Sequence, residues 1–243
     1  MPAEQFPPPP SRAAVAGRRQ VLGGLGAAAL AASGLLPPNV TRAAPAPVPA
    51  LVPATLPPPV AFDVLRGGDV IGSHQVDFRG STNDFSVRTR IDIVVRLLGI
   101  TVFVFRHDGS ERWRGGRLQA FESKTTDDDG EFFVTGRASG DAFNITHRKG
   151  TEVAPADIMV GSYWTPSIAR QTQLIDPQRG RLKTQQLLST DALTVPVDGK
   201  PIETTRYRVI GLTDGWVAYD AAGRWLAAEV KKKGTDIRYR LRS

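Results

Sequence analysis

The chain has 243 residues, of which 41% are hydrophobic, and this is enough for one domain with a real hydrophobic core. It contains no cysteine, which excludes disulfides, thiolate catalysis and cysteine-ligated metals. The net charge is +7, but residues 1–50 hold four arginines and one glutamate, so the remainder carries only +4. A mild positive charge of this size is compatible with an anionic surface or ligand, but it is no signature of a nucleic-acid-binding protein.

Residues 1–50 show the order of regions that is typical of an export leader. Arg18 and Arg19 precede an apolar run of small residues from Gly23 to Leu36, which is a twin-arginine pattern. The run is shorter than the roughly 20 residues that span a bilayer, so it suits a cleaved leader better than an anchor. We expect a periplasmic or exported protein without a transmembrane span after cleavage. The alternative is a cytoplasmic protein with an alanine-rich tail.

Residues 51–59 are predicted to be a proline-rich linker. Prolines have no backbone donor and favour extended polyproline II, and four of them fall here: Pro53, Pro57, Pro58 and Pro59. Such a segment acts as a spacer without a core of its own. Residues 60–243 then form a single β domain.

The clearest strand runs from Asp84 to Arg96, where apolar and polar residues alternate. A strand places alternate residues on opposite faces, whereas a helix would scatter them. The apolar positions are Phe85, Val87, Thr89, Ile91, Ile93 and Val95. The segment from Asp236 to Arg242 repeats the pattern. Weaker strand candidates are Phe62–Leu65, Val70–Phe78, Arg117–Thr125, Phe132–Ala138, Phe143–His147, Arg181–Leu188, Ile202–Ile210, Trp216–Tyr219 and Trp225–Val230.

Turn sequences separate these strands, among them Gly67-Gly68, Asp129-Gly130 and Asp198-Gly199. Short strands joined by tight turns predict an all-β fold, namely an antiparallel meander of about ten to twelve strands. A sheet of this size has to curl, so we expect a barrel or a half-barrel with one short helix.

Two segments depart from simple alternation. Ile100 to Phe105 is apolar on both faces, which predicts a strand that is covered on both sides. The second segment is the predicted helix at residues 166–175, with Thr165 as N-cap, Pro166 at the first position and Pro177 beyond the end. This helix could plug the curled sheet, and Trp164 and Ile168 should then be buried.

The leading functional hypothesis is a non-enzymatic binding or envelope-accessory module. A curved sheet can leave an apolar groove for a small molecule. The partner would be an apolar or amphipathic small molecule or an envelope component. The predicted ligand-binding residues are Phe103, Phe105, Tyr163, Trp164 and Trp216. No cofactor, metal ligand or catalytic residue is predicted, and the sequence leaves the oligomeric state open.

Two alternatives remain open. A hydrolase acting on an envelope substrate would need two polar groups to meet in one cleft; its candidates are His74, His107, Asp92, Glu122 and Asp220. A structural partner protein would instead use an exposed edge strand or the arginines of the C-terminal strand. The basic turn Lys231–Lys233 is either a solvated face or a contact for anionic head groups.

The order of short motifs resembles a bacterial family of exported domains, the domain-of-unknown-function family 6134. The likeness runs from Phe62 to Arg242 and rests on Phe62–Val64, Gly72–His74, Thr89–Ile93, Arg106–His107, Trp113–Gly116, Ser162–Pro166, Leu174–Gly180, Tyr207–Arg208, Tyr219–Asp220, Gly223–Trp225 and Ile237–Leu241. The family has no established activity, so the resemblance implies a domain type and no catalytic residue. The domain is also remotely similar in style to periplasmic curved-sheet envelope proteins such as lipoprotein carriers.

Overall fold

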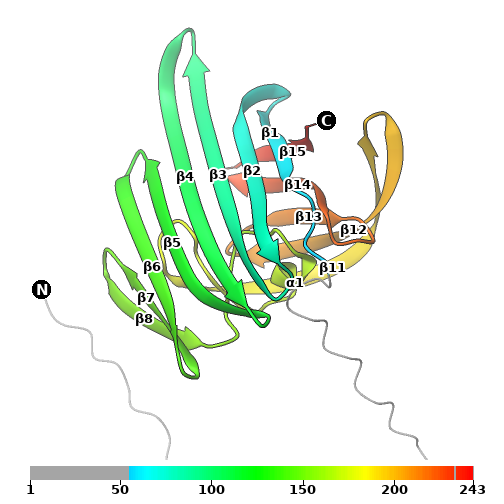
Figure 1. Cartoon of the computed structure of the whole chain (residues 1–243). Helices are drawn as coiled ribbons and strands as arrows, with labels where there is room; N and C mark the ends of the chain where they lie inside the picture. The colour runs from blue at the N-terminus through cyan, green and yellow to red at the C-terminus, as the bar shows by residue number, and fades with distance from the viewer. Residues whose placement is uncertain (1–54, 233, 243) are drawn as a thin grey trace, which may run out of the picture. The chain divides into compact units, whose positions relative to one another are not determined.

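The structure is a computed structural model and describes residues 55–232 and 234–242. One curled sheet of fifteen strands dominates these residues (Figure 1). The strands are β1 (Val60–Arg66), β2 (Asp69–Ser81), β3 (Asp84–Leu97), β4 (Ile100–Arg114), β5 (Arg117–Asp127), β6 (Gly130–Ser139), β7 (Ala142–His147), β8 (Gly150–Pro155), β9 (Met159–Val160), β10 (Gln173–Ile175), β11 (Leu182–Val197), β12 (Lys200–Gly211), β13 (Gly215–Tyr219), β14 (Trp225–Lys232) and β15 (Thr235–Leu241).

Strand pairing follows chain order except where the first strand meets the last. The order is β8-β7-β6-β5-β4-β3-β2-β1-β15-β14-β13-β12-β11-β10-β9, so β1 joins β15 in the middle of the sheet. All pairs are antiparallel except β9 with β10. The antiparallel meander is therefore confirmed, with more strands than expected, and its two ends do not pair to close a barrel.

Alternation along the strands separates a dry concave face from a charged outer face. In β3, Phe85 and Val87 are buried while Arg88 and Arg90 are exposed. Arg88 pairs with Asp108 and Arg90 with Asp77 on neighbouring strands. Exposed pairs of this kind are worth little individually, so the sheet curls chiefly because its apolar face avoids water.

The segment between β8 and β11 lies on the concave side. It contacts both halves of the sheet, which are β1–β8 and β9–β15. Trp164 packs edge to face on Phe85 of β3, while the Tyr219 hydroxyl of β13 donates to the Tyr163 carbonyl oxygen at 2.7 Å. Trp164 is 1% exposed and Ile168 is fully buried. The expectation that these residues are buried within the curled sheet is confirmed.

The helix α1 (Pro166–Ala169) is a single turn, so the prediction of a helix over 166–175 was wrong in length. Residues 173–175 form β10, which pairs with both β9 and β11. Pairing on both sides satisfies more backbone groups than another helical turn would. Thr165 makes no side-chain cap bond, and its buried hydroxyl oxygen has no hydrogen-bond partner among the described residues.

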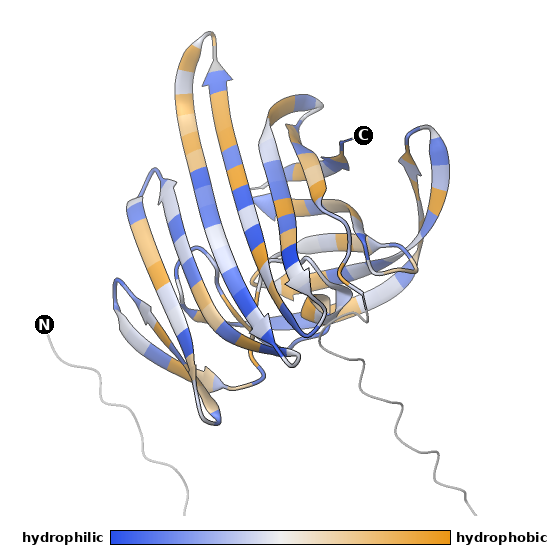
Figure 2. Cartoon of the chain, viewed as in Figure 1, coloured by the Kyte–Doolittle hydropathy of each residue, from blue (hydrophilic) through white to orange (hydrophobic). Residues whose placement is uncertain are grey.

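The prediction that Ile100–Phe105 is covered on both sides was also wrong. Ile100 is 69% and Val102 is 53% exposed. The β3–β4 hairpin is longer than its neighbours, because β2 reaches only Ile93 of β3 and β5 reaches only Arg106 of β4. The hairpin end therefore projects beyond the sheet, and apolar (orange) positions follow the upper part of β4 in Figure 2.

β8, at one end of the sheet, contacts β11 near the other end through side chains. Glu152 of β8 accepts the backbone N–H of Leu182 in β11 at 2.8 Å and contacts Arg181. The Leu182 bond and the Arg181 charge hold the pKa of Glu152 below its usual value. The predicted leader, residues 1–50, lies outside the described residues. Within the described residues, no helix is long and apolar enough to cross a membrane.

Candidate functional site

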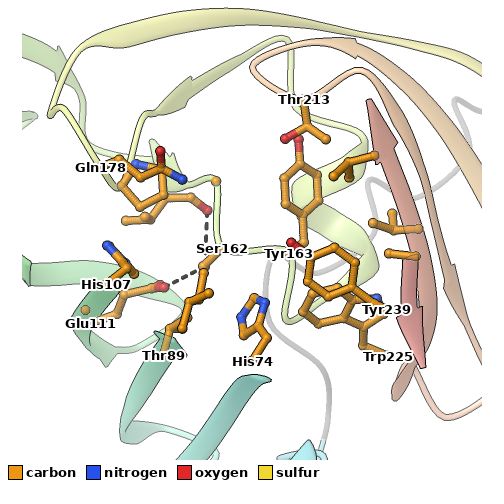
Figure 3. Close-up of a pocket in the computed structure, with 18 of the residues that line it drawn as sticks. His74, Thr89, His107, Glu111, Ser162, Tyr163, Gln178, Thr213, Trp225 and Tyr239 are labelled. Carbon is orange, nitrogen blue, oxygen red and sulfur yellow. Dashed lines mark hydrogen bonds between the residues drawn. The ribbon is translucent and has the colours of Figure 1, made fainter. Parts of the chain in front are cut away.

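A cavity of about 100 Å³ lies on the concave side, between strands β2–β5 and strands β13–β15. His74, His107, Glu111, Ser162 and Tyr163 line it (Figure 3). Lys232 also lines it. The volume accommodates several waters or the end of a small molecule. The site is therefore a polar cluster inside an otherwise apolar interior.

Glu111 is the most constrained of these groups. Its Oε1 accepts the Ser162 hydroxyl at 2.6 Å, and its Oε2 accepts the indole N–H groups of Trp113 at 2.9 Å and Trp164 at 3.2 Å. All three donors are neutral, and Glu111 forms no ion pair within the described part of the chain. Burial raises the pKa of Glu111 to about 7, although the three hydrogen bonds act in the opposite direction.

Two histidines face the same cavity. The Nδ1 atom of His107 lies 2.8 Å from the Thr125 hydroxyl. Burial lowers the pKa of His107 to about 4, and burial together with the nearby His107 lowers that of His74 to about 3. Both imidazoles are therefore neutral near pH 7. Gly109 leaves room for the His107 ring, since a Cβ atom there would lie only 2.9 Å from Nε2.

His74 stands out because neither ring nitrogen has a hydrogen-bond partner among the residues described, although the residue is only 5% exposed. Its ring lies edge-on to Trp225 and Tyr239. A buried imidazole offers one donor and one acceptor, and leaving them unpaired costs free energy. Buried polar atoms in native proteins nearly always have a hydrogen-bond partner, so this ring indicates a position for a ligand or a water molecule.

We expect His74→Leu to stabilise the ligand-free protein. The substitution removes unpaired polar atoms from an aromatic environment. The free energy of unfolding should therefore rise by about 1 kcal/mol. Chemical denaturation of both proteins at pH 7 would measure it. His107→Leu is the matched control, because it breaks the bond with Thr125 and should destabilise. A clear loss of stability in His74→Leu would show that the imidazole is satisfied in the folded state.

Tyr163 is held in a left-handed backbone conformation with φ of 56°. Its hydroxyl donates to the Oε1 atom of Gln185, and burial raises its pKa to about 12. Non-glycine residues adopt this conformation only where the surroundings enforce it, often at functional sites. Here it turns the chain so that Ser162 and Tyr163 face the cavity while Trp164 enters the core.

The predicted ligand-binding residues are only partly brought together. Tyr163 lines the cavity, and Phe103 and Phe105 are half-buried on the same face of β4 as His107 and Glu111, since all occupy alternate positions. Trp164 lies in the core and does not line the cavity. Trp216 packs instead against a separate cluster formed by Val195, Ala218, Leu226 and Ala227.

Sequence reasoning missed Glu111, although the alternation of β4 contained the signal. Counting in steps of two from Phe105 places Glu111 on the buried face. A glutamate is almost never buried without a charged partner, so its position there indicates a special role. Among the hydrolase candidates, His74 and His107 share the cavity. Asp92 and Glu122 instead pair with arginines at the surface, and Asp220 caps a turn.

The polar cluster contains no serine–histidine hydrogen bond among the described residues. The Ser162 hydroxyl donates to Glu111, and no hydrogen bond joins it to either cavity histidine in the described residues. Within residues 55–232 and 234–242, no group of His, Asp or Glu side chains is placed to hold a metal ion. The geometry supports hydrogen bonding to a bound molecule.

An open, curled antiparallel sheet with an internal cavity makes this a β-barrel-like protein. The chain is similar to a crystal structure described as a beta-barrel-like protein of domain of unknown function DUF1849 from Brucella abortus, with 12% identity and a TM-score of 0.57. The match covers 79% of this chain and 97% of that one, and it shows the fold alone. The family described as "Domain of unknown function (DUF6134)" matches residues 62–242, and the chain belongs to it. The search of curated proteins finds no match.

Proposed function

We propose that this protein is a non-enzymatic binding module that holds an apolar or amphipathic ligand on the concave side of its sheet. The observation that carries the proposal is the cavity in which the buried ring of His74 has no partner. A ligand whose polar end donates to and accepts from this ring would remove the cost of burying it unpaired. Glu111 and His107 line the same space.

An apolar track leads away from the polar end. Ile91 lines the cavity, and Ile93 follows it on the same face of β3. Phe105 and Ile93 are directly opposite each other across the two strands, as are Phe103 and Val95. These half-buried side chains would cover the apolar part of a ligand too long for the cavity alone.

We also propose that the protein works outside the cytoplasm, with a small molecule or another component of the cell envelope as its partner. The twin-arginine pattern before the apolar run at residues 23–36 supports this location, as does the lack of cysteine in a chain that would fold before export. Fractionation of the native host, with detection of the processed chain, tests the location. Recovery of the full-length chain in the cytoplasm alone would contradict it.

Binding is tested by extracting protein purified from its native host and analysing the extract by mass spectrometry. Ala228 is a buried wall residue of the cavity, opposite Tyr239 on the next strand. Ala228→Leu should fill the space and reduce the amount of co-purified ligand by about tenfold or more, at a stability cost of about 1–3 kcal/mol. Ala138→Leu, at an exposed position of β6 that does not line the cavity, is the matched control.

Two results would contradict the binding proposal. The first is an extract from the unmodified protein with no stoichiometric molecule. The second is equal ligand recovery from the two leucine variants, since this would place the bound molecule elsewhere. Circular dichroism of each variant checks that the sheet is retained.

A further inference from the structure

The end of the β3–β4 hairpin is a free-standing two-stranded ribbon, formed by residues 94–105. Beyond Ile93 and Arg106, β3 and β4 pair only with each other, and no other described strand flanks them. Figure 1 shows this hairpin projecting past its neighbours. An isolated hairpin is marginally stable in water. A long apolar hairpin that projects from the sheet therefore suggests a binding partner.

The apex of the ribbon combines exposure with backbone strain. Leu98 and Gly99 form a two-residue loop in which both φ angles are positive, 49° and 81°. Such turns favour Asn-Gly, because asparagine tolerates this backbone far better than leucine does. Leu98 is nevertheless 95% exposed, and Ile100 beside it is 69% exposed. Neither local backbone preference nor packing within the described chain explains a leucine here.

We propose that this apex docks on an anionic lipid surface, with Leu98 and Ile100 entering the interfacial region. The ribbon is apolar on both faces, since Val94 opposes Val104 on one side and Val95 opposes Phe103 on the other. A lipid interface surrounds a projecting apex on all sides, whereas a protein strand would cover only one edge. The backbone of the two-residue turn needs to enter only the interfacial zone, where water still reaches polar groups.

Charge at the same end of the sheet favours an anionic surface. The strand registers place the β1–β2 and β14–β15 turns at the end that carries the apex. The β5–β6, β7–β8 and β12–β13 turns lie at the same end. In the hairpin and the turns at this end, six bases have no ion pair in the described residues, namely Arg66, Arg96, Arg148, Lys149, Lys231 and Lys232, against four such acids, Asp69, Asp128, Asp214 and Asp236. Basic residues near an anionic membrane each contribute attraction on the order of 1 kcal/mol.

The strands of the docking hairpin also carry part of the cavity wall. Lys232 and Ile91 line the cavity, and each lies on a strand leading to this end of the sheet. This inference stands on the exposed hairpin, so it survives if the cavity proves to bind nothing.

Because the chain has no cysteine, one cysteine can be introduced at a chosen position and labelled selectively. Leu98→Cys and Val153→Cys would be made in the full chain and labelled with an environment-sensitive fluorophore. Val153 of β8 is 63% exposed and serves as the matched control. With vesicles of phosphatidylcholine and phosphatidylglycerol, the label at 98 should shift to the blue and brighten, while the label at 153 should not. Phosphatidylcholine vesicles alone should give a smaller response.

A folded variant that loses docking completes the test. Leu98→Asn suits the turn better, so it should keep or raise the melting temperature while lowering the affinity for anionic vesicles by about tenfold. Unchanged binding by this variant would overturn the proposal. So would equal responses at positions 98 and 153, or a blue shift at 98 that depends on protein concentration without vesicles, since that result would assign the apex to a second copy of the chain.

Discussion

Trp164→Ala is expected to lower the free energy of unfolding by about 3–5 kcal/mol. The indole is 1% exposed and packs edge to face against Phe78, Phe85 and Trp113. Its removal leaves a void against β2, β3 and β4 and takes one donor from buried Glu111. Each effect alone destabilises, because the core repacks only in part and the carboxylate loses one of its three donors.

Urea denaturation followed by far-ultraviolet circular dichroism measures this loss. Trp216→Ala is the matched control, since Trp216 is half-buried in the smaller cluster beside Leu226 and its indole has no hydrogen-bond partner among the described residues. A smaller loss is expected there. Equal losses would mean that the segment around Trp164 is not what joins the halves of the sheet.

Glu111→Gln should remove a pH dependence from the stability of the protein. The pKa of Glu111 is raised to about 7 in the folded state, from an ordinary value of 4.5. The folded state therefore holds this proton more tightly than the unfolded state. The stability that Glu111 contributes is fully present below pH 4.5 and is lost as the pH rises through 7. A shift of this size corresponds to about 3 kcal/mol.

The measurement is the difference in unfolding free energy between the two proteins at pH 5 and at pH 8. Glutamine has nearly the same shape, and its oxygen can accept both indole groups while its amide donates to Ser162. As the pH rises, the free energy of unfolding of the variant should increase relative to that of the unmodified protein. His74 and His107, whose pKa values are lowered, lose their contribution as the pH falls below 6.5, and they do so in both proteins. Parallel curves would show that Glu111 does not titrate in this range.

Strand content was predictable because it depends on local alternation. Asp84–Arg96 was expected and β3 spans Asp84–Leu97, since one apolar face decides the conformation of a strand. Residues 173–175 show the limit of this reasoning. Their apolar spacing also fits a helix, and only pairing with β9 and β11, from other parts of the chain, makes them a strand.

The site was less predictable for a related reason. The pattern of β4 shows that Phe103 and Phe105 share a face with His107, but it does not show which side chains from β13–β15 lie opposite. Trp164 and Trp216 look alike in sequence, and the fold places them in different clusters. The length of the β3–β4 hairpin beyond its neighbours depends on where β2 and β5 stop pairing, so the exposed apex also escaped prediction.

The side-chain contacts of Glu152 have a mechanical consequence. A closed barrel can widen only by separating a whole row of backbone hydrogen bonds. Here β5 and β8 reach residues 177–182 through side chains: Glu152 contacts Leu182 and Arg181, Asp127 pairs with Arg179, and the Ser123 hydroxyl donates to the Pro177 carbonyl oxygen. Releasing these contacts would leave every strand pair in place. The spacing between β5 and residues 177–182 can therefore change without loss of strand pairing.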